Sequence, residues 1–346
     1  MNKKDYLKML NSIEQGEPTA KPEQHERVIF IDGLNLFLRN FAVLNFINSS
    51  GTHIGGLAGF LRSLGALINQ IQPTSIYIVF DGVGASTNRR YLLPEYKTGR
   101  HLNRITNWDA FDDINDENDS KVDQIIRLVQ YLKCLPVKVC SIDKVEADDI
   151  IAYMSKDMAK RFDTKSYIVS SDRDFLQLVD DNVTVYRPIE REFYDPKTVK
   201  EKFGIAPENF IHYKVLLGDA SDKVPGIKGL GKKGVLKRFP ELADGPIPFD
   251  KLFDLSEERL KESVVYARVI QDWDKLLNTK KIMDLEIPMV SDEEKEYLSQ
   301  LPLDPLNELR ILEFMSLYTE DGLNHIIKNT EFWLKDTFTR LVYDIK

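Results

Sequence analysis

The chain of 346 residues is poor in the residues that build disulfide frameworks and zinc sites. It has two cysteines, Cys134 and Cys140, and five scattered histidines. The cysteines lie in an apolar, strand-like stretch and fit no metal-ligand spacing, so we interpret them as buried, reduced thiols. Neither a disulfide scaffold nor a zinc site is therefore expected.

Long hydrophobic runs and an excess of positive charge are also missing. No apolar stretch reaches the roughly 18 residues of a membrane helix, and the start of the chain lacks the apolar core of a secretory signal. We therefore expect a cytoplasmic protein without a membrane partner. The formal net charge is −8, which by itself argues against a nucleic-acid partner, because binding phosphates requires Lys and Arg. The charges are strongly clustered, however, so their positions matter more than their sum.

Apolar patterning divides the chain into three regions. Residues 1–26 combine a short amphipathic stretch with Gly and Pro among polar residues, which predicts an N-terminal extension and linker. Residues 27–187 alternate short apolar runs with helix-length segments, which predicts an α/β core with a mainly parallel sheet flanked by helices. Residues 188–346 show helical spacing and predict a helical C-terminal region. The predicted strands are 28–31, 76–80, 167–170 and 183–186, and the main predicted helices are 56–70, 121–131, 147–160, 258–277 and 307–318.

Carboxylates follow three of the predicted strands. Asp32 ends the first strand, Asp81 the second, and Asp172 with Asp174 the third. A single Asp after a strand usually caps a helix or opens a turn. Ligands collect beyond the carboxyl ends of parallel strands, however, and several acids placed there are expected to meet at one site.

Two further groups of acids surround this pattern. Glu146, Asp148 and Asp149 begin a predicted helix, where acidity alone is ordinary because the helix dipole favours it. Asp219 and Asp222 precede a glycine-rich turn. So many carboxylates would raise each other's pKa values unless cations bound among them, and paired Mg²⁺ ions, which prefer oxygen ligands, serve phosphoryl chemistry. We predict two Mg²⁺, replaceable by Mn²⁺, held by Asp32, Asp81, Glu146, Asp148, Asp149, Asp172, Asp174, Asp219 and Asp222.

The glycine-rich turn indicates an anion site. Gly226, Gly229 and Gly231 permit a tight turn that exposes backbone N–H groups, and a helix is predicted to begin near Lys232. A flexible loop with solvated lysines is the simpler alternative. Because the turn directly follows Asp219 and Asp222, we favour contact with a nucleic-acid backbone through Gly226, Lys228, Gly229, Gly231, Lys232 and Lys233.

A long connection over residues 83–120 mixes basic and aromatic side chains. Such mixtures suit single-stranded nucleic acid, since phosphates pair with the cations and bases stack on the rings. The connection is too long for a simple loop, so it is either a disordered insert or a mobile flap over the site, and we favour the flap. Its predicted nucleic-acid contacts are Arg89, Arg90, Tyr96 and Lys97.

These motifs together resemble the flap endonuclease and 5′→3′ exonuclease family, which has a PIN-like core, and most closely its phage-encoded exonuclease–RNase H branch. The resemblance covers about residues 27–240. The matching stretches are Ile-Asp-Gly at 31–33, Phe-Asp-Gly at 80–82, Pro-Glu-Tyr-Lys at 94–97, Glu-Ala-Asp-Asp at 146–149, Ser-Asp-Arg-Asp-Phe at 171–175, Gly-Asp-Ala-Ser-Asp at 218–222 and Pro-Gly-Ile-Lys-Gly-Leu-Gly at 225–231.

The resemblance implies a fold and an activity. It implies a PIN-like core with a helical arch in segment 83–120, and a duplex-binding helix-three-turn-helix at about 212–240. It implies a structure-specific, Mg²⁺-dependent 5′ nuclease that hydrolyses DNA or RNA–DNA hybrids at 5′ ends or flaps, with primer removal in replication or repair. It also implies a K⁺ site in the turn from Gly226 to Gly231.

The resemblance further implies a role for each acid and for the arch. Lys97 matches an arch lysine that contacts the scissile phosphate, and Arg100 would assist it. Asp148 and Asp172 would be central to catalysis. One metal would be held by Asp32, Asp81, Glu146 and Asp148, and the other by Asp149, Asp172, Asp174 and Asp222, with Asp219 as an outer contributor.

Three alternatives compete with this hypothesis. The chain could be a DNA-junction binder without activity, or a PIN-type ribonuclease acting on single-stranded RNA. An Asp-x-Asp phosphatase is disfavoured because Leu34 stands where that chemistry needs an acid. The C-terminal helices are expected to be core, and a surface for another replication protein is the weaker hypothesis. We expect a monomer.

Overall fold

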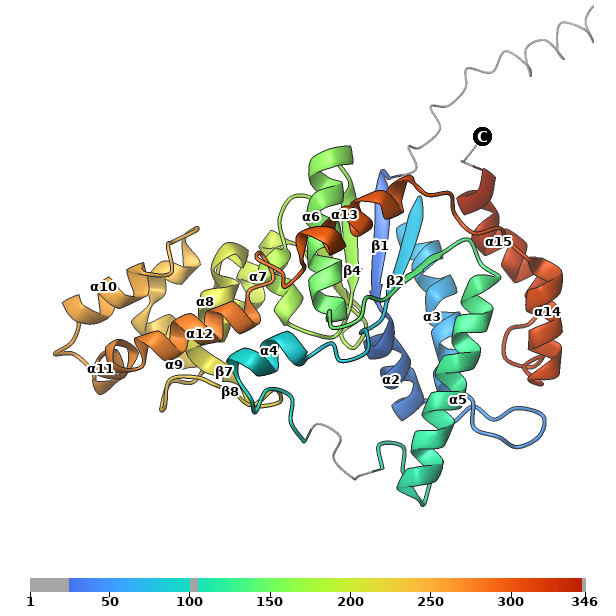
Figure 1. The fold of residues 1–346 in the computed structure, drawn as a ribbon, viewed down its shortest axis with the longest axis horizontal. Helices are drawn as coiled ribbons and strands as arrows, with labels where there is room; N and C mark the ends of the chain where they lie inside the picture. The colour runs from blue at the N-terminus through green and yellow to red at the C-terminus, as the bar shows by residue number, and fades with distance from the viewer. Residues whose placement is uncertain (1–24, 100–104, 344–346) are drawn as a thin grey trace, which may run out of the picture.

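A six-stranded sheet lies at the centre of the fold in the computed structural model, which describes residues 25–99 and 105–343 (Figure 1). Its order is β3-β2-β1-β4-β5-β6; the first five strands are parallel and β6 is antiparallel to β5. The four predicted strands and the predominantly parallel arrangement are confirmed. The bounds are β1 (Arg27–Asp32), β2 (Ser75–Val79), β3 (Lys138–Cys140), β4 (Lys165–Val169), β5 (Val183–Arg187) and β6 (Glu192–Tyr194).

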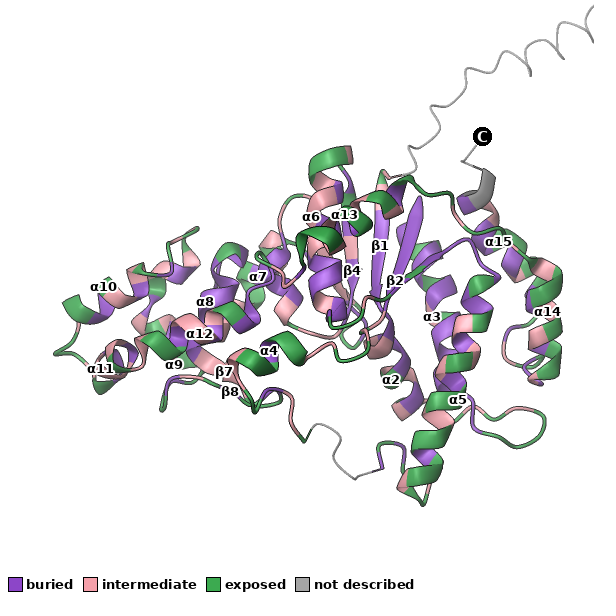
Figure 2. Cartoon of the chain, viewed as in Figure 1, coloured by how far each residue is buried: buried purple, intermediate pink, exposed green. Residues whose placement is uncertain are grey.

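Both faces of the sheet are covered, which explains why its central strands are apolar at consecutive positions. Val28 and Phe30 of β1 belong to one core, and Ile29 and Ile31 to the other. The central strands are buried along their length (Figure 2). One face carries α2 (Gly33–Val43), α3 (Gly55–Ile71), α5 (Ile114–Lys133), α14 (Ile311–Glu320) and α15 (Thr330–Tyr343); the other carries α6 (Ala147–Phe162) and the short helix η1 (Asp174–Leu178).

A helical lobe extends from one side of the sheet (Figure 1). It contains the predicted helix–turn–helix, because α8 and α9 flank the glycine-rich turn and α9 begins at Lys232 as expected. Residues 258–277 do not form one helix, since the chain breaks between α10 and α11. The bounds are α7 (Pro196–Phe203), η2 (Pro207–Asn209), α8 (Phe210–Leu217), β7 (Gly218–Asp219), β8 (Val224–Pro225), α9 (Lys232–Arg238), η3 (Pro240–Ala243), α10 (Lys251–Glu258), α11 (Val264–Gln271) and α12 (Trp273–Met283). After the lobe, α13 (Asp292–Gln300) and η4 (Leu301–Leu303) return to the sheet, where α13 lies beside α6 (Figure 1).

The predicted boundary at 187/188 does not separate two domains. Strand β6 lies beyond it and still pairs with β5. The last helices also return to the core: the Arg310 N–H donates to the Cys134 carbonyl oxygen over 2.9 Å, and the rings of Phe314 and Tyr131 are 4.9 Å apart. The C-terminal region therefore splits between the lobe and the sheet core.

In its described parts, segment 83–120 contains α4 (Thr87–Leu92), turns and the first residues of α5. The helical arch implied for this segment stays a prediction. The part that follows the gap is tied to the core, because Glu117 Oε1 accepts the N–H groups of Thr106 and Asn107 over 2.8 Å each. Residues 100–104, which include Arg100, lie outside the described residues, as do residues 1–24 of the predicted extension over 1–26.

Two expectations from composition can be compared with the structure. Cys134 and Cys140 are both buried and are not joined by a disulfide. Among the helices in the described part of the chain, none combines the length and apolarity needed to cross a membrane.

Candidate functional site

The ends of β1 and β4 are linked through one serine hydroxyl. Asp32 caps α2, since its Oδ1 accepts the Asn35 N–H over 3.0 Å. Its Oδ2 accepts from Ser170 Oγ over 3.0 Å, and the same Oγ accepts the Asp172 N–H over 3.0 Å. Asn35 Oδ1 accepts the Ser171 N–H over 3.0 Å. The neighbouring strands β1 and β4 therefore bring Asp32 and Asp172 together as predicted.

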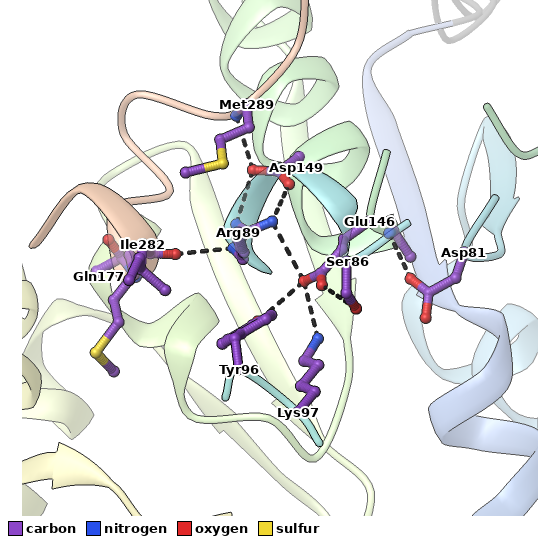
Figure 3. Close-up of polar contacts among 12 residues, drawn as sticks. Asp81, Ser86, Arg89, Tyr96, Lys97, Glu146, Asp149, Gln177, Ile282 and Met289 are labelled. Carbon is purple, nitrogen blue, oxygen red and sulfur yellow. Dashed lines mark hydrogen bonds and ion pairs between the residues drawn. The ribbon is translucent and has the colours of Figure 1, made fainter. Parts of the chain in front are cut away.

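The start of α6 brings two more of the acids to this edge. Asp81, two residues after β2, accepts the Ala147 N–H over 2.8 Å. The preceding Glu146 is only 1% exposed. Its carboxylate accepts from Ser86 Oγ over 2.9 Å, Tyr96 OH over 3.2 Å and Lys97 Nζ over 2.8 Å (Figure 3). Burial raises the pKa of Glu146, but Arg89 and Lys97 outweigh it, so this pKa lies below its usual value.

Three other carboxyls have raised pKa values, and the largest cause in each case is the loss of solvent around the carboxyl group. The pKa of Asp32 rises to about 7, with contributions from the charges of Asp172 and Asp81 that hydrogen bonds partly offset. The pKa of Asp174 rises to about 6, and that of Asp148 lies well above its usual value; Asp172 adds to both shifts. These acids are close enough to oppose each other's ionisation, as a cation-binding cluster would without its cation.

The chemistry of this cluster fits a divalent cation, but its side chains are not arranged as a finished cage. Within the described ranges, no three Asp, Glu, His or Cys side chains form a group ready to hold a metal ion. Lysines supply the opposite charge instead. Lys214 Nζ lies 2.6 Å from Asp174 Oδ1 and 2.8 Å from Asp219 Oδ2, as Lys97 lies beside Glu146. The donor set is all oxygen, which suits Mg²⁺ or Mn²⁺.

Asp222 joins the cluster from the helical lobe. Together with Asp148 and Asp174 it lines a small enclosed cavity between the lobe and the sheet. Its backbone carbonyl accepts the Lys97 N–H over 3.0 Å, and Lys97 has a left-handed φ of 53°. The turn of the lobe therefore touches the segment that carries Lys97.

Asp149 does not join the cluster, so the structure does not support its predicted role as a metal ligand. It points to the other side of the α6 start (Figure 3). Both of its oxygens accept from the guanidinium of Arg89, and Oδ1 also accepts the Met289 N–H over 2.9 Å. In this arrangement its carboxylate faces Arg89 and the backbone at Met289, not the other acids.

Two of the predicted nucleic-acid contacts, Arg89 and Tyr96, are buried in the structure. Arg89 is 3% exposed, and its Nε donates to the Ile282 carbonyl oxygen over 2.8 Å. Tyr96 is 4% exposed and points at Glu146, so its ring is no stacking platform. The exposed ring nearby is Tyr91. Arg90 is exposed and Lys97 partly so, and both stay in the proposed contact set.

The glycine-rich turn has the geometry that its composition predicts. A Cβ on Gly226 would lie 2.1 Å from the carbonyl carbon and oxygen of Leu217, so only glycine fits there. Gly229 has a φ of +81°. The side chains of Lys228, Lys232 and Lys233 are exposed around the turn.

A hollow of about 440 Å³ connects this turn to the acids. Asp172 and Asp219 lie in its wall with four basic side chains, Arg173, Arg187, Lys214 and Lys232. The remaining wall includes aromatic rings from α7 and α8. The turn and the carboxylate cluster thus open onto one surface.

A second hollow of about 500 Å³, here called the basic groove, was not predicted from the sequence. Arg39 of α2, Arg62 of α3 and Arg191 between β5 and β6 line it, and no acidic residue does. None of the three arginines forms an ion pair with a residue that the structure describes. The basic groove is a neighbour of the first hollow. Leu36 lines the groove and the preceding Asn35 lines the first hollow; likewise, Tyr186 lines the groove and the following Arg187 lines the first hollow. The arginines are far apart in the chain, and no sequence signal links them.

The family model described as "5′-3′ exonuclease, N-terminal resolvase-like domain" matches residues 27–204, about half of the chain. The chain belongs to this family. The 5′-3′ exonuclease of Buchnera aphidicola (strain APS) is 33% identical over 211 residues, which is 60% of this chain and 68% of that protein. DNA polymerase I of Bacillus subtilis (strain 168) is 30% identical over 249 residues, 70% of this chain. The chain matches only 26% of that polymerase's length.

A solved structure shows the same fold. The structure of T5 5′-exonuclease with bound divalent metal ions (zinc) matches with a TM-score of 0.65 at 19% identity, and covers 80% of this chain and 98% of that one. At this identity the likeness supports the fold alone. The fold and the family expected from the sequence motifs are both confirmed.

Proposed function

We propose that the chain is a divalent-metal-dependent 5′ nuclease that hydrolyses phosphodiester bonds of DNA, or of RNA–DNA hybrids, near 5′ ends or flaps during replication or repair. The observation that carries this proposal is the group formed by the buried Asp32 with the half-buried Asp148, Asp172 and Asp174, three of which have raised pKa values. Asp172 of this group opens onto the hollow with the basic side chains. Family membership and the exonuclease relatives support it.

The proposed metal ligands are the predicted acids without Asp149. Asp32, Asp81, Glu146, Asp148, Asp172 and Asp174 surround the strand ends, and Asp219 and Asp222 approach from the lobe. Bound Mg²⁺, or Mn²⁺, would polarise the phosphate and activate water. Glu146 and Asp174 can take part only if Lys97 and Lys214 give up their ion pairs.

This exchange gives Lys97 a function in the reaction. In the structure its ammonium group lies against Glu146 and offsets that charge. With a divalent cation held by Glu146, Lys97 would be free to turn to the phosphate and stabilise the charge that develops there. Arg100, proposed to assist it, lies three residues further, outside the described residues.

The nucleic acid would follow the positive surfaces. Duplex would rest on the turn at Gly226–Gly231 with Lys228, Lys232 and Lys233, and its strand would run through the hollow past Asp172. The basic groove lies beyond and offers three arginines to further phosphates. This path explains how a chain with a net charge of −8 can bind nucleic acid.

The surface proposed for a replication-protein partner is small. The large side chains of Phe314, Tyr318 and Phe338 in α14 and α15 are buried. Leu312 and Phe332 remain exposed, at 86% and 68%. A partner that uses these helices would therefore contact those two residues. The monomeric state and the cytoplasmic location stay predictions.

The test is cleavage of a 5′-labelled flap duplex with Mg²⁺, beside RNA-primed flaps, nicks and single strands. We expect cleavage of flaps that chelation stops, and its loss in Asp148→Asn and Asp172→Asn. Full activity of either variant would exclude the metal roles. Tight flap binding without cation-dependent cleavage would favour the junction binder, and a preference for single-stranded RNA would favour the ribonuclease.

A further inference from the structure

The guanidinium of Arg268 lies against the glycine-rich turn. Arg268 belongs to α11, outside the helix–turn–helix, and its Nη1 donates to the Lys228 carbonyl oxygen over 2.7 Å. The same nitrogen would lie 3.0 Å from a Cβ built on Gly229. The positive charge of Arg268, 40 residues further along the chain, therefore lies in contact with the turn.

Helix α11, which carries this charge, is also bonded to the C-terminal end of α9. Tyr266, two residues before Arg268, is buried and donates through its OH to the Arg238 carbonyl oxygen at the end of α9 over 3.0 Å. Val265 and Val269 are buried on the same helix. Because packing fixes the helix beside α9, Arg268 reaches the turn from a rigid support.

The K⁺ site that the family resemblance implies would have to do without the Lys228 carbonyl in this arrangement. Such a site needs free carbonyl oxygens in the turn, because K⁺ binds oxygen ligands. The Lys228 carbonyl is already bound by a group that carries the same charge as K⁺. A second cation at that oxygen would be repelled by the first.

Arg268 also has donors left for a ligand. A guanidinium offers five N–H donors, and one donates to Lys228. Arg268 forms no ion pair with any residue in the described part of the chain, whereas Arg259 on the neighbouring loop pairs with Glu241. It is only partly buried and stands beside the exposed Lys228 and Lys232.

We propose that Arg268 takes the place of the monovalent cation at this turn and binds a backbone phosphate of the duplex directly, so that duplex binding does not require K⁺. This inference rests on the proposed function and deepens it. A guanidinium suits the position, since it can donate to a carbonyl and to a phosphate oxygen at once.

The test compares duplex binding in KCl and in tetramethylammonium chloride at equal ionic strength, without divalent cation, using a fluorescent duplex and its anisotropy. We expect the wild type to bind equally in both salts. Arg268→Met should bind roughly tenfold more weakly, with a salt slope shallower by about 1, and KCl should restore part of its binding because the carbonyl is then free. Arg268→Lys keeps the charge and should retain most of the affinity. Lys275→Met removes one exposed charge from α12 and should bind like the wild type.

Two outcomes would overturn the inference while the proposed nuclease function stands. One is a wild type that binds duplex in KCl but not in tetramethylammonium. The other is an Arg268→Met protein whose affinity falls equally in both salts with an unchanged salt slope, which would make Arg268 a structural brace. If the wild type neither binds duplex nor cuts flaps with Mg²⁺, the proposed function and this inference fail together.

Discussion

Arg89 and Asp149 form a buried ion pair that joins three parts of the fold. Arg89 comes from α4 and is 3% exposed, and Asp149 from the first turn of α6 is 1% exposed. Arg89 also reaches the carbonyl of Ile282 in α12, and Asp149 accepts the Met289 N–H. The pair therefore holds the helix start that presents Glu146 and Asp148 to the site.

Breaking this pair should cost stability, and removing Asp149 alone should spare metal binding. Arg89→Met leaves Asp149 buried without its partner, and we expect a loss of about 3–5 kcal/mol in the free energy of unfolding, measured with urea. Asp149→Asn should also destabilise the fold but leave the Mg²⁺ concentration for half-maximal cleavage unchanged, whereas Asp148→Asn should abolish cleavage.

The matched control for this prediction is a surface pair on the same helix. Arg161→Met breaks an i,i+4 pair with Asp157 that is partly exposed, and should cost less than about 1 kcal/mol. A stable Asp149→Asn protein that needs far more Mg²⁺ would instead return Asp149 to the ligand set.

The carboxylate cluster predicts an unusual pH dependence for the metal-free protein. The pKa of Asp32 is about 7 in the fold, against an ordinary value of 3.8. Between about pH 4 and 7 the folded state thus holds a proton that the unfolded chain has released, so this group lowers stability as pH rises through that window. Asp32→Asn removes the effect, and its melting temperature should fall less than that of the wild type from pH 5 to pH 7.

Divalent cations should reverse this trend. They bind the ionised carboxylates, so Mg²⁺ or Mn²⁺ should raise the melting temperature of the wild type more at pH 7 than at pH 5. The melting temperature of the Asp32→Asn variant should rise only slightly with these cations at either pH. Equal melting curves with and without cation at pH 7 would contradict a metal site at these acids.

The sequence predicts where the acids after strands lie, but it does not predict which way Asp149 and Arg89 point. Asp32, Asp81 and Asp172 could be placed because each follows a strand, and the ends of parallel strands converge whatever the rest of the chain does. On a helix, adjacent residues point about 100° apart, so Asp148 and Asp149 face different neighbours. Which one meets the site depends on α12 and α13, more than 120 residues later, and no local pattern carries that information.

The basic groove should contribute several phosphate contacts. Removing its three charges in Arg39→Gln/Arg62→Gln/Arg191→Gln should weaken flap binding and make the plot of log affinity against log salt shallower by about 2–3. A control with the same change in net charge is Lys133→Gln/Lys160→Gln/Lys328→Gln, whose lysines are exposed and lie outside both hollows. Identical slopes for the two triple variants would remove the basic groove from the proposed path.

Two glycines of the turn should separate a structural role from a contact role. In Gly226→Ala the new methyl group would lie 2.1 Å from Leu217 and 2.4 Å from the Gly218 nitrogen, so the β7–β8 pairing must open. We expect lower stability and a loss of duplex binding together, by thermal melting and anisotropy.

At Gly231 the φ is −99° and nothing lies within 4 Å of an added Cβ, so Gly231→Ala should fold with unchanged stability. If the duplex backbone packs on this glycine, Gly231→Ala should still bind it more weakly. Unchanged binding would mean that Gly231 shapes the start of α9 and does not touch the nucleic acid.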